Sequence, residues 1–174
     1  MVNMSKVPDE TKSMNTCYGV IVCLIKDKEI YLSRRLDTPL FSKKWQLLNS
    51  WMRSGESSFE VAINLIDKET GITITRDRLF IASTISITNL HEFFYIYLVN
   101  LNKNECVVDI EDKYRSFWKA FPLNRAIVLD VVPAIRPILR KLLKNLAIAE
   151  FDRAFEEGEK EKQQEELETQ MGYC

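Results

Sequence analysis

Short apolar or alternating segments recur along the chain, and each of them has the length of a β-strand. The continuous apolar run at 17–25 predicts a buried strand. After a polar turn at 26–29, the alternation at 30–35 predicts a second, half-exposed strand of a β-hairpin. Further strands are predicted at 45–48, 80–87 and 92–101, and a short strand or loop at 117–121.

Two other segments space their apolar residues as helices do. The helix predicted at 57–70 follows Ser54, a suitable N-cap, and precedes Gly71, which suits the left-handed residue that ends a helix. From Val132 onward apolar residues recur every three or four positions, and Pro137 predicts a kink or a late start. The order of strands and helices predicts an α+β fold.

Composition sets the outer limits of this organisation. The 174 residues suit one domain with a tail, and 28% charged residues with 46% hydrophobic residues exclude wholesale disorder. We expect a flexible arm at 1–15, a domain at 16–147 and an acidic, helical or disordered tail at 148–174. From 150 to 174, nine acids face three bases, a net charge of −6, which leaves a net charge of +5 on residues 1–149.

The sequence shows no membrane or secretory signal and no framework of cysteines. The longest uncharged apolar run has nine residues, against about 20 in a membrane-spanning helix, so no contact with a membrane is expected. One histidine and four scattered cysteines without a CxxC pair argue against a structural zinc site and a disulfide framework. The expected compartment is the reducing cytoplasm.

One segment contains residues in a pattern that indicates a chemical function. Residues 45–72 read WQLLNSWMRSGESSFEVAINLIDKETGI. This segment resembles the signature of Nudix hydrolases, which runs Gly, five residues, Glu, seven residues, then Arg-Glu-apolar-x-Glu-Glu-x-Gly-apolar. With Gly71 at its end, the signature places its first Gly on Ser50 and its next Glu on Glu56. The resemblance covers residues 16–145 and implies a Nudix-type mixed β-sheet sandwiched between helices, followed by a charged helical C-terminal extension.

The same resemblance implies a decayed catalytic motif. In the family, carboxylates on one helix face hold Mg²⁺ or Mn²⁺, which neutralises a diphosphate and activates a water. The corresponding residues of this chain are Leu65, Lys68 and Glu69. Replacing glutamate by lysine beside a divalent ion is a swing on the order of 10 kcal/mol before relaxation. The resemblance therefore leaves Glu69 and Glu56 as residual catalytic residues, and as metal ligands only if a metal is bound.

A protein that has lost such a catalytic motif can still bind the ligand. Arg34 and Arg35 offer planar, bidentate contacts to phosphate, and Lys68 places a fixed positive charge where the family holds a cation. The leading hypothesis is therefore a Nudix-fold protein that binds a nucleotide or diphosphate-containing ligand, without a metal cofactor, and hydrolyses it little or not at all.

Two other functions stay open. The first is an atypical metal-dependent hydrolase of nucleoside diphosphate derivatives, in which Glu56 and Glu69 act with one of the acids Glu105, Asp109, Glu111 and Asp112. The second is an RNA-binding or assembly module that uses the basic helix 136–144 or the acidic tail. The aromatics at 93–97 fit a surface for stacked bases, but a strand buried on both faces explains them more simply. The resemblance alone suggests a homodimer.

Overall fold

The computed structural model describes residues 16–36, 39–108, 115–147 and 149. They form two compact units, each assembled from separate stretches of the chain. The first unit contains residues 16–26 and 47–108, and the second contains the remaining described residues. The predicted arm at 1–15 and the predicted tail, apart from residue 149, lie outside the described residues. No helix in the described part of the chain is both long enough and apolar enough to cross a membrane.

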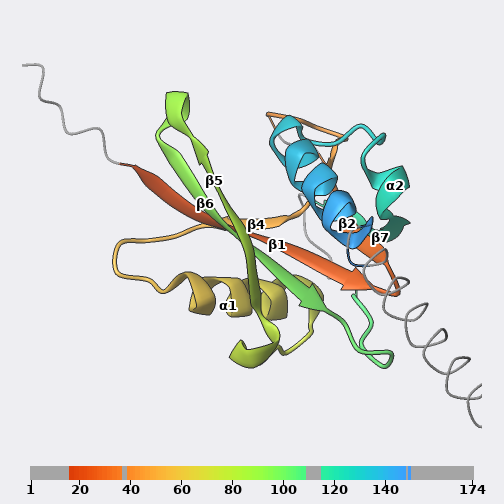
Figure 1. The fold of residues 1–174 in the computed structure, drawn as a ribbon. Coiled ribbons are helices and arrows are strands. Elements are labelled where there is room, and N and C mark those ends of the chain that lie inside the picture. Colours follow the sequence, from red (N-terminus) through yellow and green to blue (C-terminus); the bar gives the residue numbers. More distant parts are fainter. Residues whose placement is uncertain (1–15, 37–38, 109–114, 148, 150–174) are drawn as a thin grey trace, which may run out of the picture. The chain divides into compact units, whose positions relative to one another are not determined.

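The first unit is a mixed four-stranded sheet with one long helix against it (Figure 1). The strands lie in the order β4-β1-β6-β5, with β1 parallel to β6 and the other two pairs antiparallel. Their bounds are β1 Cys17–Lys26, β4 Leu48–Trp51, β5 Phe80–Ile87 and β6 Glu92–Asn100. The helix α1 spans Ser58–Thr70, and the ring centroid of Phe59 lies 5.2 Å from that of Tyr97 on β6.

The core of this unit follows from the central position of β1. Since β1 has a neighbouring strand along each edge, its backbone groups are paired, and residues 20–24 are buried. This explains why the sequence shows a continuous apolar run there instead of an alternation. Against the sheet, α1 buries a stripe at helical spacing, formed by Ala62, Leu65, Ile66, Glu69 and Thr70.

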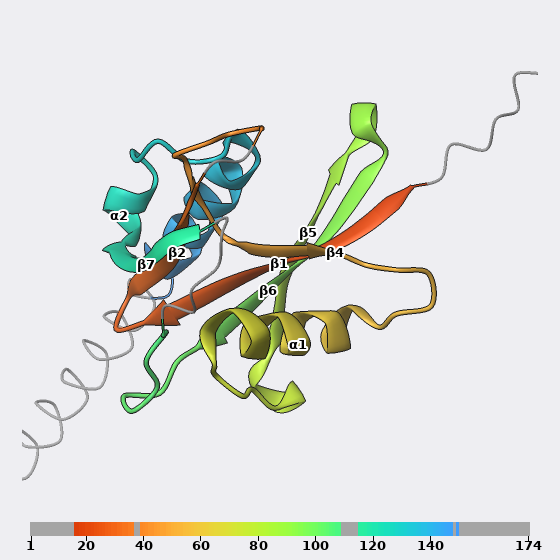
Figure 2. The same cartoon turned by 180° about the vertical axis from the view of Figure 1, so that it is seen from behind.

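The second unit is built around β2, and Figure 2 shows it from behind. Antiparallel pairs join β2 to β3 and to β7, and Trp45 of β3 bridges to Val131 in parallel. The bounds are β2 Glu29–Arg35, β3 Trp45–Gln46, β7 Arg115–Pro122, α2 Leu123–Ala126 and the 3₁₀ turn η3 Pro133–Ile135. Residues 136–147 are helical and are called the final helix below. Pro137 stands in the first turn of this helix, where its missing N–H removes no bond, which confirms the late start.

Most predicted elements are confirmed, with differences at their ends. The helix predicted at 57–70 begins at Ser58, and its N-cap is Ser57, so the N-cap prediction of Ser54 was wrong. Gly71 has the predicted left-handed conformation, with φ 70°. The strand predicted at 45–48 is split into β3 and β4, and neither α2 nor the 3₁₀ turns η1 Arg76–Arg78 and η2 Thr88–Leu90 were predicted.

The aromatic strand differs from the expectation of burial on both faces. On β6, Ile96 and Tyr97 are buried, whereas Phe93, Phe94 and Tyr95 remain half-buried. Double-sided burial therefore holds for the second half of the strand only. On the face that Tyr97 shares with Phe93 and Tyr95, α1 begins beside Tyr97 and does not continue over the first half.

Gly19 on β1 leaves room for the ring of Phe94 on the neighbouring strand. A Cβ atom at position 19 would stand 2.5 Å from Cε1 of Phe94 and 3.0 Å from the backbone oxygen of Ser50. The same ring packs against Trp51, with the centroids 4.9 Å apart. The absent side chain is thus what lets β1, β4 and β6 share one aromatic contact.

We predict that Gly19→Ala lowers the free energy of unfolding by about 1–3 kcal/mol, because overpacking displaces the Phe94 ring. Urea denaturation measures the loss. In a Phe94→Ala background the ring is gone, so the same substitution should cost clearly less. An equal loss in both backgrounds would show that the Phe94 ring is not the cause.

Candidate functional site

The α1 positions that the sequence singled out differ in burial. Leu65 and Glu69 belong to the buried stripe, with 8% and 9% of their surface exposed, whereas Lys68 is exposed to solvent. Leu65 and Glu69, four residues apart, share the buried face, whereas position 68 lies roughly 130° around the helix from the middle of the buried stripe. Leu65 therefore has a packing role in α1, and Lys68 presents its ammonium group outward.

Glu56 lies in the loop that connects β4 to α1. Its Oε2 accepts a hydrogen bond from the backbone N–H of Arg53 at 2.6 Å, and its own N–H donates to the Arg53 carbonyl at 3.2 Å. These two bonds close a tight turn over 53–56. From Ser58 to Glu69, α1 rises by about 16 Å. Glu56 and Glu69 thus lie at opposite ends of α1.

Arg34 and Arg35 belong to the second unit, where both hold neighbouring segments. The Nε of Arg34 donates to the carbonyl of Lys43 at 3.1 Å, and its guanidinium carbon lies 5.9 Å from the centre of the Trp45 ring. The Nη1 of Arg35 donates to Oε1 of Gln46 at 2.7 Å. Both arginines are half-buried and hold the loop and the strand that follow them.

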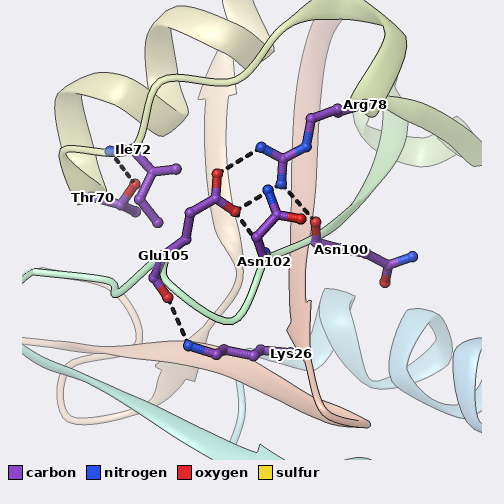
Figure 3. A network of polar contacts seen from close by, with 7 residues as sticks. All are labelled: Lys26, Thr70, Ile72, Arg78, Asn100, Asn102 and Glu105. Carbon is purple, nitrogen blue, oxygen red and sulfur yellow. Dashed lines mark hydrogen bonds and ion pairs between the residues drawn. The ribbon is translucent and has the colours of Figure 1, made fainter.

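Glu105 is held in a polar network (Figure 3). Its carboxylate accepts two bonds from the Arg78 guanidinium, at 2.6 and 2.7 Å, and a third from the backbone N–H of Asn102 at 2.7 Å. The Nζ of Lys26 donates to its carbonyl at 2.8 Å. The hydrogen bonds from Arg78 lower the pKa of Glu105 to about 2.

The other acids considered as metal ligands are placed as follows. Glu105 is committed to the network with Arg78, while Asp109, Glu111 and Asp112 lie outside the described residues. Across the ranges that the structure describes, no three His, Cys, Asp or Glu side chains gather where they could hold a metal ion.

A pocket that the sequence did not predict lies in the first unit. Its volume is about 860 Å³, within the range of small-molecule sites. The start of β1, the loop from the end of β4 to α1, and one residue of β6 line it: Thr16, Cys17, Tyr18, Trp51, Met52, Arg53, Ser54, Gly55, Glu56 and Tyr95. A possible signal was the mixture of aromatic, charged and glycine residues at 51–56, but the partners on β1 and β6 are far away in the sequence.

Comparison with solved structures connects this architecture to known proteins. The NUDIX domain of Shewanella oneidensis NrtR, solved with ADP ribose, has a TM-score of 0.60 and 15% identity, over 76% of this chain and 89% of that chain. For E. coli dihydroneopterin triphosphate pyrophosphohydrolase, the TM-score is 0.58 and the identity 16%, over 74% of this chain and 95% of that chain. The chain has the Nudix fold.

Other Nudix-like structures are equally similar. The C-terminal domain of mouse MUTYH, solved with human PCNA, has a TM-score of 0.61 and 11% identity, over 76% of this chain and 91% of that chain. The sequence itself matches no family model and no curated protein. The Nudix fold agrees with the α+β class and with the family resemblance of residues 45–72.

We predict that Glu105→Gln destabilises the protein by about 1–2 kcal/mol at pH 7, since it leaves Arg78 without its charged partner. The pKa of Glu105 is lowered in the folded state, so its ion pair stabilises the fold above the ordinary carboxyl pKa of 4.5. This stabilisation is lost as the pH falls from 4.5 towards 2. Urea titrations across this range should show wild type and variant converging.

The matched control is Glu60→Gln, at an exposed position of α1. It should change stability by less than about 0.5 kcal/mol at any of these pH values. A pH-independent difference between Glu105→Gln and wild type would contradict the role of the ion pair.

Proposed function

We propose that this Nudix-fold protein binds a nucleotide or another diphosphate-containing ligand and hydrolyses it little or not at all. The observation that carries the proposal is the chemistry of α1: Leu65 is buried in its apolar stripe, and Lys68 is exposed as a cation. The Nudix signature has metal-binding carboxylates at both positions. The domain of similar fold solved with ADP ribose supports this ligand class.

The side chains of α1 do not fit the metal centre of the Nudix signature. Mg²⁺ and Mn²⁺ take oxygen ligands, and a site needs several of them at one point. Glu56 already accepts a bond within its loop and lies at the other end of α1 from Glu69. The exposed ammonium of Lys68 adds positive charge to the same end of α1 as Glu69, and this charge disfavours a divalent ion there. We infer that Lys68 provides positive charge for a phosphate without a metal ion.

The proposed cytoplasmic, metal-independent function predicts a definite calorimetric result. Isothermal titration with ADP-ribose, nucleoside triphosphates and capped RNA should give heat with at least one of them, to the same extent with and without Mg²⁺. Lys68→Glu should weaken this binding about tenfold or more, because it reverses the charge facing the phosphate. Lys144→Glu, an exposed change on the final helix, serves as the control and should leave the affinity unchanged.

The same titration distinguishes the other functions. No heat with any of these ligands would rule out the proposal. Multiple turnovers with Mg²⁺ or Mn²⁺, abolished by Glu69→Gln, would establish a hydrolase instead. A steep fall in RNA affinity with rising salt would establish an RNA-binding module on the basic final helix. A protein-assembly role has support in the MUTYH domain, which was solved with PCNA; a homodimer would be detected by sedimentation of the same sample.

We further predict that the double substitution Leu65→Glu with Lys68→Glu raises the affinity for Mn²⁺, because it returns two carboxylates to the helix beside Glu69. Since Leu65 is buried, the apo protein should lose about 2–3 kcal/mol of stability. Added Mn²⁺ should restore part of that loss, measured as a rise in melting temperature.

Lys144→Glu with Asn145→Glu gives the same change in net charge at two exposed positions of the final helix. This control should show no stabilisation by Mn²⁺. If the two double variants respond alike, then the signature is misplaced on α1.

A further inference from the structure

A row of aromatic side chains lies beside the N-terminal end of α1. The ring centroids of Tyr18 and Phe93 are 5.8 Å apart, and those of Phe93 and Tyr95 are 5.2 Å apart. The parallel register of β1 and β6 and the alternation along each strand place these rings on one face of the sheet. Tyr97 is on the same face, and its hydroxyl lies 2.7 Å from the Oγ of Ser58, the first residue of α1. The row therefore continues past the point where the helix begins.

The residues that the structure describes do not close over this part of the face. Tyr18 on the central strand β1 is 47% exposed, and Phe93 and Tyr95 are half-buried, although aromatic side chains on central strands are ordinarily buried. Tyr18 and Tyr95 border the pocket of about 860 Å³ whose other wall is the loop 51–56. Leaving apolar rings in contact with water is unfavourable, so the pocket is suited to a ligand that covers them.

The loop adds two charges of opposite sign to these rings. Glu56 and Arg53 both line the pocket, and both are exposed. One carboxylate oxygen of Glu56 accepts the N–H of Arg53. A carboxylate has about four acceptor positions, so it can accept further hydrogen bonds from a ligand. The guanidinium group of Arg53 suits a phosphate.

We propose that this pocket binds a guanine mononucleotide, with its base stacked on Tyr18 and Tyr95 of the aromatic row, its Watson–Crick edge on Glu56 and its phosphate on Arg53. Guanine is the base that offers two adjacent donors, the ring N–H and the 2-amino group, to one carboxylate. This inference rests on the proposed function and deepens it, since it names the base and a second phosphate-binding cation, Arg53, at the opposite end of α1 from Lys68.

A thiol in the pocket provides a direct test. Cys17 lines the pocket and is exposed, while burial raises the pKa of Cys23 to about 12 and keeps it unreactive. In a Cys106→Ser, Cys174→Ser variant, saturating GMP should slow the reaction of Cys17 with a disulfide reagent by about fivefold or more. In the matched Cys17→Ser, Cys174→Ser variant, the exposed Cys106 should react at the same rate with and without GMP.

Affinities for GMP then assign the individual roles. Tyr95→Leu removes a stacking ring and should weaken binding about tenfold, whereas Tyr95→Phe keeps the ring and should bind like wild type. IMP, which lacks the 2-amino group, should bind about fivefold more weakly than GMP, and Glu56→Gln should remove this difference. Far-ultraviolet circular dichroism of each variant checks that the fold is retained.

Two outcomes separate this inference from the proposed function. If nucleotides give heat but leave Cys17 unprotected, and Tyr95→Leu binds as wild type does, then the ligand binds elsewhere and the pocket assignment is wrong while the proposed function stands. If GMP, ADP-ribose and nucleoside triphosphates all fail to bind, then both are wrong.

Discussion

The packing of α1 against the first unit's sheet is the constraint on which the candidate site depends. Five side chains of α1 are buried, and Leu65 and Glu69 belong to this stripe. Once the stripe is fixed, Lys68 faces solvent, because at about 100° per residue position 68 lies roughly 130° around the helix from the middle of the stripe. The contact between Ser58 and Tyr97 also fixes where the helix begins, and hence where the aromatic face of the sheet is left uncovered. The packing of α1 on the sheet therefore determines both that Lys68 is exposed and where the pocket lies.

Local patterns were sufficient to predict the elements whose environment is uniform along their length. The run at 17–25 became β1, and the apolar spacing with Gly71 defined α1. The segment at 45–48 was different. The backbone N–H of Trp45 bonds to Asp130 and its carbonyl accepts from Val132, more than 80 residues away, while residues from Leu48 onward pair with β1. The alternation of neighbouring residues does not show which distant strands a segment pairs with, so the break between β3 and β4 could not be found from the sequence.

The candidate site shows the same limit at the level of side chains. Residue type and spacing found Glu56, Lys68 and Glu69, but could not show that a turn over 53–56 already uses the carboxylate of Glu56. Nor could they show that Glu105 is paired with Arg78, 27 residues earlier in the chain. The aromatic residues of β6 were recognised as a possible stacking surface, yet the choice between stacking and burial depends on how far α1 extends over them. Spatial neighbours decide each of these cases, and they come from different elements.

The proposed function separates two roles that a divalent ion combines in an active Nudix site. Such an ion neutralises the phosphates, and it also lowers the pKa of a bound water so that hydroxide can attack near neutral pH. The ammonium of Lys68 can fulfil the first role, since it is a compact, strongly hydrated point charge. It cannot fulfil the second, because it holds water only by donating hydrogen bonds and does not act on that water as a Lewis acid. Leu65 stands where the Nudix signature has a carboxylate ligand, and it packs in the buried stripe of α1 instead. In this proposal fixed charges hold the nucleotide, and its hydrolysis lacks an activated water.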